Sequence, residues 1–264
     1  MAAGLKAAWE FRQFILSSIR HELIARFARS RLGSLWMVIQ PLSQVLIYAL
    51  ILSAVLSAKL PGLEGPFAYA IYLTAGMLGW SLFMEVVTRS LGVFIDNGNL
   101  IKKMAFPRLV LPLIVVGSSL INNVVLFVAA MGVFTVLGHI ASATVLWVPL
   151  LTVITLAFAL GVGLILGILN VFLRDIGQIM PILLQFLFWF TPVVYPAHIV
   201  PDAVHAILVL NPLYHLVSAY QNVLAFGEPP ALTGLAVVAA IAAGLLVLAR
   251  ILYQRAKPEL VDAL

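Results

Sequence analysis

The positions of apolar and charged residues divide the chain into long uncharged stretches and short charged segments. From Leu109 to Leu173 there is no Asp, Glu, Lys or Arg, and only the residues around Gly138 and Ser142 interrupt the large aliphatic side chains. A membrane-spanning helix needs about 20 apolar residues, so this stretch predicts two of them. No soluble domain can bury so much apolar sequence, and the pattern indicates an integral membrane protein.

Four further stretches are free of charged residues over a length that could cross a bilayer: 32–58, 65–84, 176–201 and 229–249. A fifth, 203–227, is ambiguous because it carries polar groups such as His205, Asn211 and Gln221. Such groups are costly in hydrocarbon unless they find partners. Counting this stretch as a span gives seven helices, and rejecting it gives six.

The basic residues favour six spans, because Lys and Arg accumulate in cytoplasmic loops. With the N-terminus inside, Lys59 is the one basic residue that falls outside, whereas a seventh span would also move Arg250, Arg255 and Lys257 there. We therefore expect an all-α integral membrane protein, with 1–264 as one transmembrane domain and both termini cytoplasmic. The expected spans are about 34–58, 66–88, 109–137, 144–173, 176–198 and 230–250. The segment 200–227, between spans 5 and 6, is expected to be external and re-entrant, with non-helical backbone.

Composition supports this class of protein. Hydrophobic residues make up 63% of the sequence and charged residues 9%, compared with about a quarter in globular proteins, and the mean hydropathy is +1.13. The net charge of +5 comes from residues at the ends of apolar stretches, so it indicates orientation in the membrane and not a nucleic-acid partner. Without cysteine there is neither a disulfide nor a thiolate metal site.

Residues 5–29 precede the first span and predict an amphipathic helix on the membrane surface. Leu5, Trp9, Ile15 and Ile19 belong to its apolar face, on which Glu22 intrudes, and a bend near His21 would accommodate the mismatch. The alternative is a cytoplasmic helix packed on protein.

Enzyme motifs are absent from the sequence. There is no Gly-Lys dipeptide, so there is no phosphate-binding loop, and the five histidines lack metal-ligand spacing. Gly161, Gly163 and Gly167 predict close helix packing. Glu85 lies one turn before Arg89 and predicts an ion pair. The adjacent amides Asn122 and Asn123 predict hydrogen bonds between helices, with a polar pore wall as the alternative.

Aromatic side chains gather in three of the expected spans. Those considered as lining for a substrate channel are Trp36, Tyr48, Tyr72, Trp80, Phe186, Trp189, Phe190 and Tyr195. Aromatic faces suit the apolar faces of sugar rings. Lipid-facing positions and helix packing are the alternative interpretation.

Five segments in this order resemble one family over nearly the whole chain. They are RFARSRLGSLWMVIQPL from Arg26 to Leu42, NGNLIKKMAFPR from Asn97 to Arg108, Arg174-Asp175, FWFTPVVYP from Phe188 to Pro196, and Asn211-Pro-Leu213. The sequence is similar to the membrane permeases of ABC exporters for lipid-linked polysaccharides, namely O-antigen, capsule and teichoic acid.

The resemblance implies a homodimer in the bacterial inner membrane that works with two separate ABC ATPase subunits on a lipid-linked polysaccharide. ATP and Mg would be bound by those subunits, with no cofactor on this chain, which would itself not be an enzyme. The resemblance makes 97–108 a cytoplasmic coupling segment, in which Asn99, Leu100, Ile101, Lys102, Lys103, Met104, Phe106, Pro107 and Arg108 would contact the ATPase. The alternative is a basic loop that only orients the protein.

Two other sites come from the same resemblance. Arg174 and Asp175 would form a second ATPase contact or an ion pair within the chain, and Asn211, Pro212 and Tyr214 would belong to an external gate. Competing functions are a permease of the same class for drugs or small lipids, and a membrane enzyme or scaffold of envelope synthesis.

Overall fold

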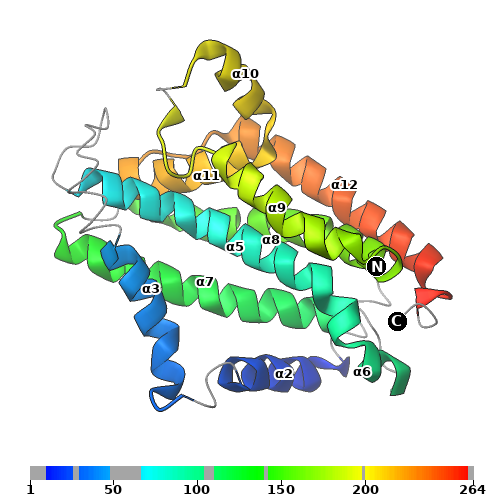
Figure 1. Ribbon diagram of the computed structural model, residues 1–264. Coiled ribbons are helices and arrows are strands. Elements are labelled where there is room, and N and C mark those ends of the chain that lie inside the picture. Colours follow the sequence, from blue (N-terminus) through cyan, green and yellow to red (C-terminus); the bar gives the residue numbers. More distant parts are fainter. Residues whose placement is uncertain are drawn as a thin grey trace.

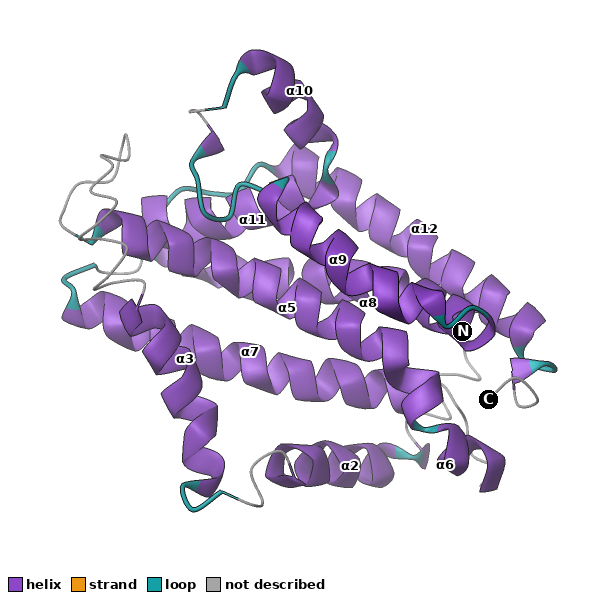
Figure 2. Ribbon diagram, in the orientation of Figure 1, coloured by secondary structure: helices purple, strands orange, loops and turns teal. Residues whose placement is uncertain are grey.

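The computed structural model describes residues 10–25, 30–47, 67–103, 110–139, 142–197 and 200–260. Within these ranges the chain is helical and contains no strand (Figures 1 and 2). Among the described residues, four helices are long and apolar enough to cross a membrane: α5 (Ala68–Asp96), α7 (Val110–Val136), α8 (Val148–Phe172) with the 3₁₀ turn η3 (Ala143–Trp147) before it, and α12 (Leu232–Ala256). The prediction of an all-α membrane protein is confirmed, while six spans remain a prediction.

Two shorter apolar helices occupy the other expected spans: α3 (Trp36–Ile47) and α9 (Asp175–Trp189). The first span was expected to reach 58, but residues 48–66 lie outside the described ranges. For the fifth, the expected end at 198 is wrong, because the helix ends at Trp189 and the chain turns through Thr191–Val193. Pro192 explains the early end: it has no N–H for helix bonding and disfavours helical geometry at the residue before it.

The central helix is α5, which packs against α7, α8 and α11 (Pro212–Gln221), while α12 covers the other side of α8. In its most apolar window 78% of α5 is buried inside the protein, compared with 22% of α12. Figure 1 shows α5, α7 and α8 running side by side, with α6 (Gly98–Lys103) and the end of α12 at the same end of the bundle. We call this the α6 end.

Small residues allow the close packing of α5 on α8, as the sequence predicts. A Cβ added at Gly163 would lie 2.6 Å from Ser90 Cβ and 3.2 Å from Val87 Cα, and one at Gly161 would lie 2.8 Å from Leu245 Cβ on α12. At Gly167 the closest group is the Ser90 carbonyl on the α5 backbone. These glycines therefore let helices approach to backbone contact.

The segment 200–227 folds into α10 (Asp202–Leu210), α11 and the π-helical turn η5 (Asn222–Phe226). The expectation of non-helical backbone is wrong there, because Asn211 separates two helices rather than ending regular structure. Its Oδ1 accepts a hydrogen bond from the Leu213 N–H at 3.0 Å, and Pro212 occupies the first turn of α11. Both are favourable helix-start features.

At the N-terminus, α2 (Arg12–Ala25) runs through His21 as one continuous helix, and the bend expected near His21 stays a prediction. The helix packs on α7, with Ile19 buried against Gly117, while Leu16 and Ile24 are exposed. One edge of α2 thus contacts protein, as the alternative interpretation required, and the rest of its apolar surface is available to lipid. The remainder of the expected range, 5–9 and 26–29, lies outside the described residues.

Candidate functional site

At the α6 end, the short helix α6 exposes polar side chains on the protein surface and packs on the bundle through Ile101. Ile101 is buried with Val93, Phe94 and Leu111. Asn99 and Lys102 are exposed, and Leu100 is half-buried. Part of the expected coupling segment, Met104, Phe106, Pro107 and Arg108, lies outside the described residues, as does the side chain of Lys103. The described part is therefore a short helix packed on the bundle with its polar groups outward.

The turn between α8 and α9 lies at the same end of the bundle and exposes Arg174 and Asp175. Asp175 is in the first turn of α9, where negative charge is favoured. Asn170, which the sequence analysis missed, ties this turn to α5: its Nδ2 donates to Leu91 O at 3.1 Å, and its Oδ1 accepts from Gly177 N–H at 2.9 Å. In the sequence, Asn170 is a lone amide in an uncharged apolar stretch, one turn before the charged pair Arg174-Asp175.

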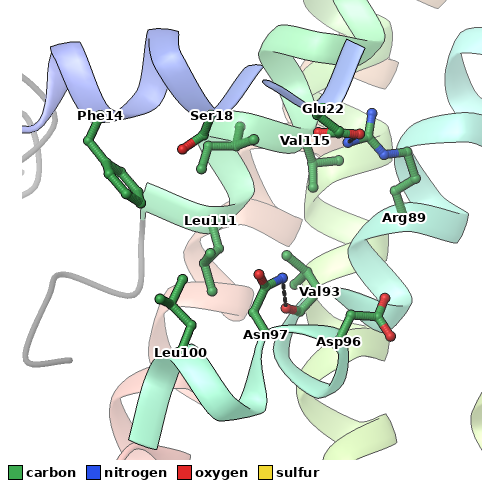
Figure 3. A pocket seen from close by; sticks show the side chains of 11 residues that line it. Phe14, Ser18, Glu22, Arg89, Val93, Asp96, Asn97, Leu100, Leu111 and Val115 are labelled. Atoms are coloured by element: carbon green, nitrogen blue, oxygen red, sulfur yellow. Dashed lines mark hydrogen bonds and ion pairs between the residues drawn. The ribbon is translucent and has the colours of Figure 1, made fainter. Parts of the chain in front are cut away.

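A cavity of about 390 Å³ lies between α2, α5, α6 and α7 (Figure 3). Phe14 and Ser18 of α2 form one wall, and Leu100 of α6 lies on another. Glu22 and Arg89 meet at its edge. The full lining is Phe14, Ser18, Glu22, Arg89, Val93, Asp96, Asn97, Leu100, Leu111, Ile114 and Val115.

The predicted polar contacts of α5 and α7 are confirmed. Arg89 Nη1 lies 3.4 Å from Glu85 Oε1. Asn122 Nδ2 donates to Glu85 Oε1 at 2.7 Å, and Asn123 Nδ2 donates to Leu78 O at 3.0 Å. Both amides serve interhelical hydrogen bonds, which removes the reason to place them on a pore wall.

At the opposite end, side chains of α5 and α11 hold the irregular backbone that follows α9. Tyr69 Oη donates to Val194 O at 2.5 Å, Tyr72 Oη to Tyr195 O at 3.3 Å, and Gln221 Nε2 to Pro192 O at 3.1 Å. Carbonyls outside a helix need such partners in a membrane. Tyr72 is accordingly buried within its own chain.

The other proposed channel residues divide by exposure. Trp80 is buried and contacts the rings of Phe83 and Phe188. By contrast, Phe186, Trp189 and Phe190 are more than half exposed, at 61%, 59% and 55%.

Three further channel candidates have different surroundings. Trp36 is half-buried and donates from Nε1 to Ser30 Oγ at 2.8 Å. Tyr195, also half-buried, donates to Trp189 O at 2.7 Å. Tyr48 lies outside the described residues. Among the described channel candidates, the exposed side chains are therefore those near the end of α9.

The expected gate residues lie in one cluster. Asn211 Nδ2 donates to Phe190 O at 3.2 Å and to Thr191 Oγ1 at 2.9 Å, which links the start of α11 to the end of α9. Pro212 follows in the first turn of α11. The ring of Tyr214 makes edge contacts with His205 and His215.

The sequence model of the ABC-2 type transporter family matches this chain over residues 13–225. The chain belongs to this family. Its relatives are named as permease subunits, which are not themselves enzymes. The ABC-2 chain is 30% identical to the O-antigen export system permease protein RfbA of Myxococcus xanthus, with 98% of each chain covered.

Other relatives of this ABC-2 transporter cover about three quarters of its length. An O-antigen export system permease protein RfbA of Klebsiella pneumoniae is 30% identical, with 76% of each chain covered. The polysialic acid transport protein KpsM of Escherichia coli is 26% identical, with 74% of this chain and 75% of KpsM covered. The resemblance seen in the sequence is thereby confirmed at the level of the family.

Proposed function

We propose that the chain is the transmembrane subunit of an ATP-driven exporter that moves a lipid-linked polysaccharide, O-antigen or similar, across the bacterial inner membrane. The similarity to an O-antigen export permease over 98% of both chains carries this proposal. The sequence contains no phosphate-binding loop, so the energy would come from two separate ATPase subunits, which bind the ATP and Mg.

A homodimeric channel forms part of the proposal. The exposed face of α9 carries Ile179, Ile182, Leu183 and Phe186, and α3 exposes Val38, Leu46 and Ile47. These apolar faces are suited to a second copy or to lipid. The aromatic residues at the end of α9 would contact sugar rings as the polymer passes, with weak binding at many places.

Export by the purified complex tests this function. The chain, co-expressed with its ATPase and reconstituted in vesicles, should move lipid-linked polysaccharide in the presence of ATP and Mg and not without ATP. Transport without the ATPase would reject the exporter mechanism. ATP-dependent movement of drugs or small lipids, with none of polysaccharide, would favour the competing permease function.

Lys102→Glu should weaken binding of the ATPase by about fivefold, because it reverses a charge at the exposed surface of α6, where single ion pairs contribute up to about 1 kcal/mol. Binding of the purified ATPase to vesicles carrying each variant measures the effect. Arg250→Glu is the matched control, since it reverses an exposed basic residue near the end of α12. An equal loss in both variants would point to general surface charge rather than to contact with α6.

Trp189→Ala should lower polysaccharide export by about two- to tenfold, the range expected for loss of one aromatic contact. ATPase binding should not change, because Trp189 lies at the other end of α9 from the Arg174 turn. Phe172→Ala provides the control, since Phe172 is also exposed, at 42%, but ends α8. Unchanged export by Trp189→Ala would remove this residue from the proposed path.

A further inference from the structure

A network of polar side chains joins α2, α5 and α7 at the edge of the cavity. Its centre is Arg89 of α5, whose Nη2 forms an ion pair with Glu22 of α2. Through Nη1 the same guanidinium donates to Ser119 Oγ on α7 at 3.1 Å, besides its contact with Glu85. The Arg89 side chain therefore joins its own helix, α5, to two others, α2 and α7.

Further hydrogen bonds hold both carboxylates in place. Ser118 Oγ on α7 lies 3.2 Å from Glu22 Oε2, and Asn122 fixes Glu85 from the same helix. Ser118 and Ser119 are fully buried, and Arg89 is only 20% exposed. Because these groups are mostly buried, charged hydrogen bonds here are stronger than at a water-exposed surface. Glu22, the residue that spoils the apolar face of α2, is thus the one that attaches α2 to the bundle.

The first half of α2 borders the cavity. The cavity separates its first half, at Phe14 and Ser18, from α6 and Leu100 (Figure 3). Leu16 and Ile24 are exposed. The apolar contact of Ile19 with Gly117 lies one turn before Glu22, so an apolar and a polar contact with the bundle come from adjacent turns of α2.

Arg89 also lies on the helix that continues toward α6. It is two turns before the end of α5 at Asp96, a distance of about 10 Å along the helix, and α6 begins at Gly98. A displacement of α6 could therefore reach α2 by way of α5 and Arg89.

We infer that Arg89 is a positioning residue that fastens the amphipathic helix α2 to the bundle, so that α2 moves together with α5 when the ATPase acts on α6. The inference rests on the proposed function for the part that concerns the ATPase. The attachment itself is a property of this chain alone and can be measured without transport.

Glu22→Gln is the primary variant, because it removes the ion pair with Arg89 but leaves Arg89 paired with Glu85 inside the bundle. Arg89→Gln is the second variant, and Arg20→Gln is the matched control, since it removes an exposed charge from the same helix. All three are placed in a background with Ile19→Cys and Gly117→Cys. The chain has no cysteine of its own. A Cβ at 117 lies 3.3 Å from Ile19 Cγ1, which is compatible with a disulfide once the longer isoleucine side chain is gone.

The first readout is the rate of disulfide formation in the purified chain. We expect Glu22→Gln and Arg89→Gln to slow it about tenfold, the change that corresponds to loss of one hydrogen bond between charged groups, and Arg20→Gln to leave it unchanged. Equal rates in Glu22→Gln and in the parent cysteine pair would overturn the inference whether or not the protein transports anything.

The second readout is ATP-driven export by the reconstituted complex. Under reducing conditions Glu22→Gln should export about tenfold less than the parent while binding the ATPase normally, and oxidation should restore export by fastening α2 covalently. A defect that oxidation does not repair would overturn the positioning role. Failure of the complex with the unaltered sequence to export would instead reject the proposed function. The rates of disulfide formation would still decide how α2 is attached.

Discussion

Gly167→Leu is expected to destabilise the fold severely, because it inserts a large side chain where α8 touches the backbone of α5. Even the first carbon of the new side chain would collide with the carbonyl of Ser90 and lie 3.3 Å from its carbonyl carbon. Backbone cannot rotate away as a flexible side chain can, so the two helices must separate. Overpacking of this kind costs about 3 kcal/mol, a large part of the 5–15 kcal/mol typical of a folded domain.

Gly244→Leu supplies the control for this prediction. Gly244 is also in a helix, α12, but has no atom within 4 Å of an added Cβ. Thermal unfolding in detergent, followed by the monodisperse fraction that remains, should therefore show a severe loss for Gly167→Leu and little change for Gly244→Leu. Similar unfolding temperatures for the two variants would mean that α5 and α8 are not packed through Gly167.

Gln221→Leu is expected to make the turn after α9 less ordered, because the Pro192 carbonyl loses the hydrogen bond from Gln221. The free energy of unfolding should fall by about 1–3 kcal/mol, the cost of a buried polar group left without its partner. Gln221 is 3% exposed and lies over Gly76 of α5, with its Nε2 bonded to the Pro192 carbonyl. Tyr72 Oη is 3.5 Å from the same carbonyl, too far to replace the lost donor fully.

Hydrogen exchange can separate the stability of this turn from that of the bundle. Protection of backbone amides from hydrogen exchange should fall in residues 190–197 while α8 stays protected. Asn170→Leu serves as the comparison at the other end of α9, because it removes a buried amide that ties a different turn to α5. Loss of protection at residues 190–197 in Asn170→Leu, or unchanged protection there in Gln221→Leu, would contradict the assignment.

Most helices could be predicted from the sequence because a long apolar stretch in a bilayer forms a spanning helix, in which its backbone groups bond to one another. The third and fourth spans were expected at 109–137 and 144–173, and the structure has α7 at Val110–Val136 and η3 with α8 at Ala143–Phe172. The second was expected to end at 88, yet α5 continues to Asp96. In the sequence, the charge of Arg89 indicated the end of the second span. In the structure Arg89 has partners on α2 and α7, and α5 continues past it.

The candidate site was harder to predict, because its contacts join segments far apart in the chain. Glu85 and Arg89 are four residues apart and could be paired from the sequence. The contact of Arg89 with Glu22 spans 67 residues, and that of Tyr72 with Tyr195 spans 123. Aromatic content alone could not distinguish the exposed Trp189 from the buried Trp80, since the distinction depends on which neighbour each helix faces.

The short length of α9 has a consequence for the bilayer beside it. Fifteen residues make a helix of about 22 Å, whereas the hydrocarbon layer is about 30 Å thick. A helix shorter than the hydrocarbon layer favours local thinning of the bilayer, so we expect water and lipid head groups to approach the end of α9 more closely than the ends of the long helices. A hydrophilic chain crossing next to α9 would then meet a thinner hydrocarbon layer than one crossing beside the 25-residue helix α12.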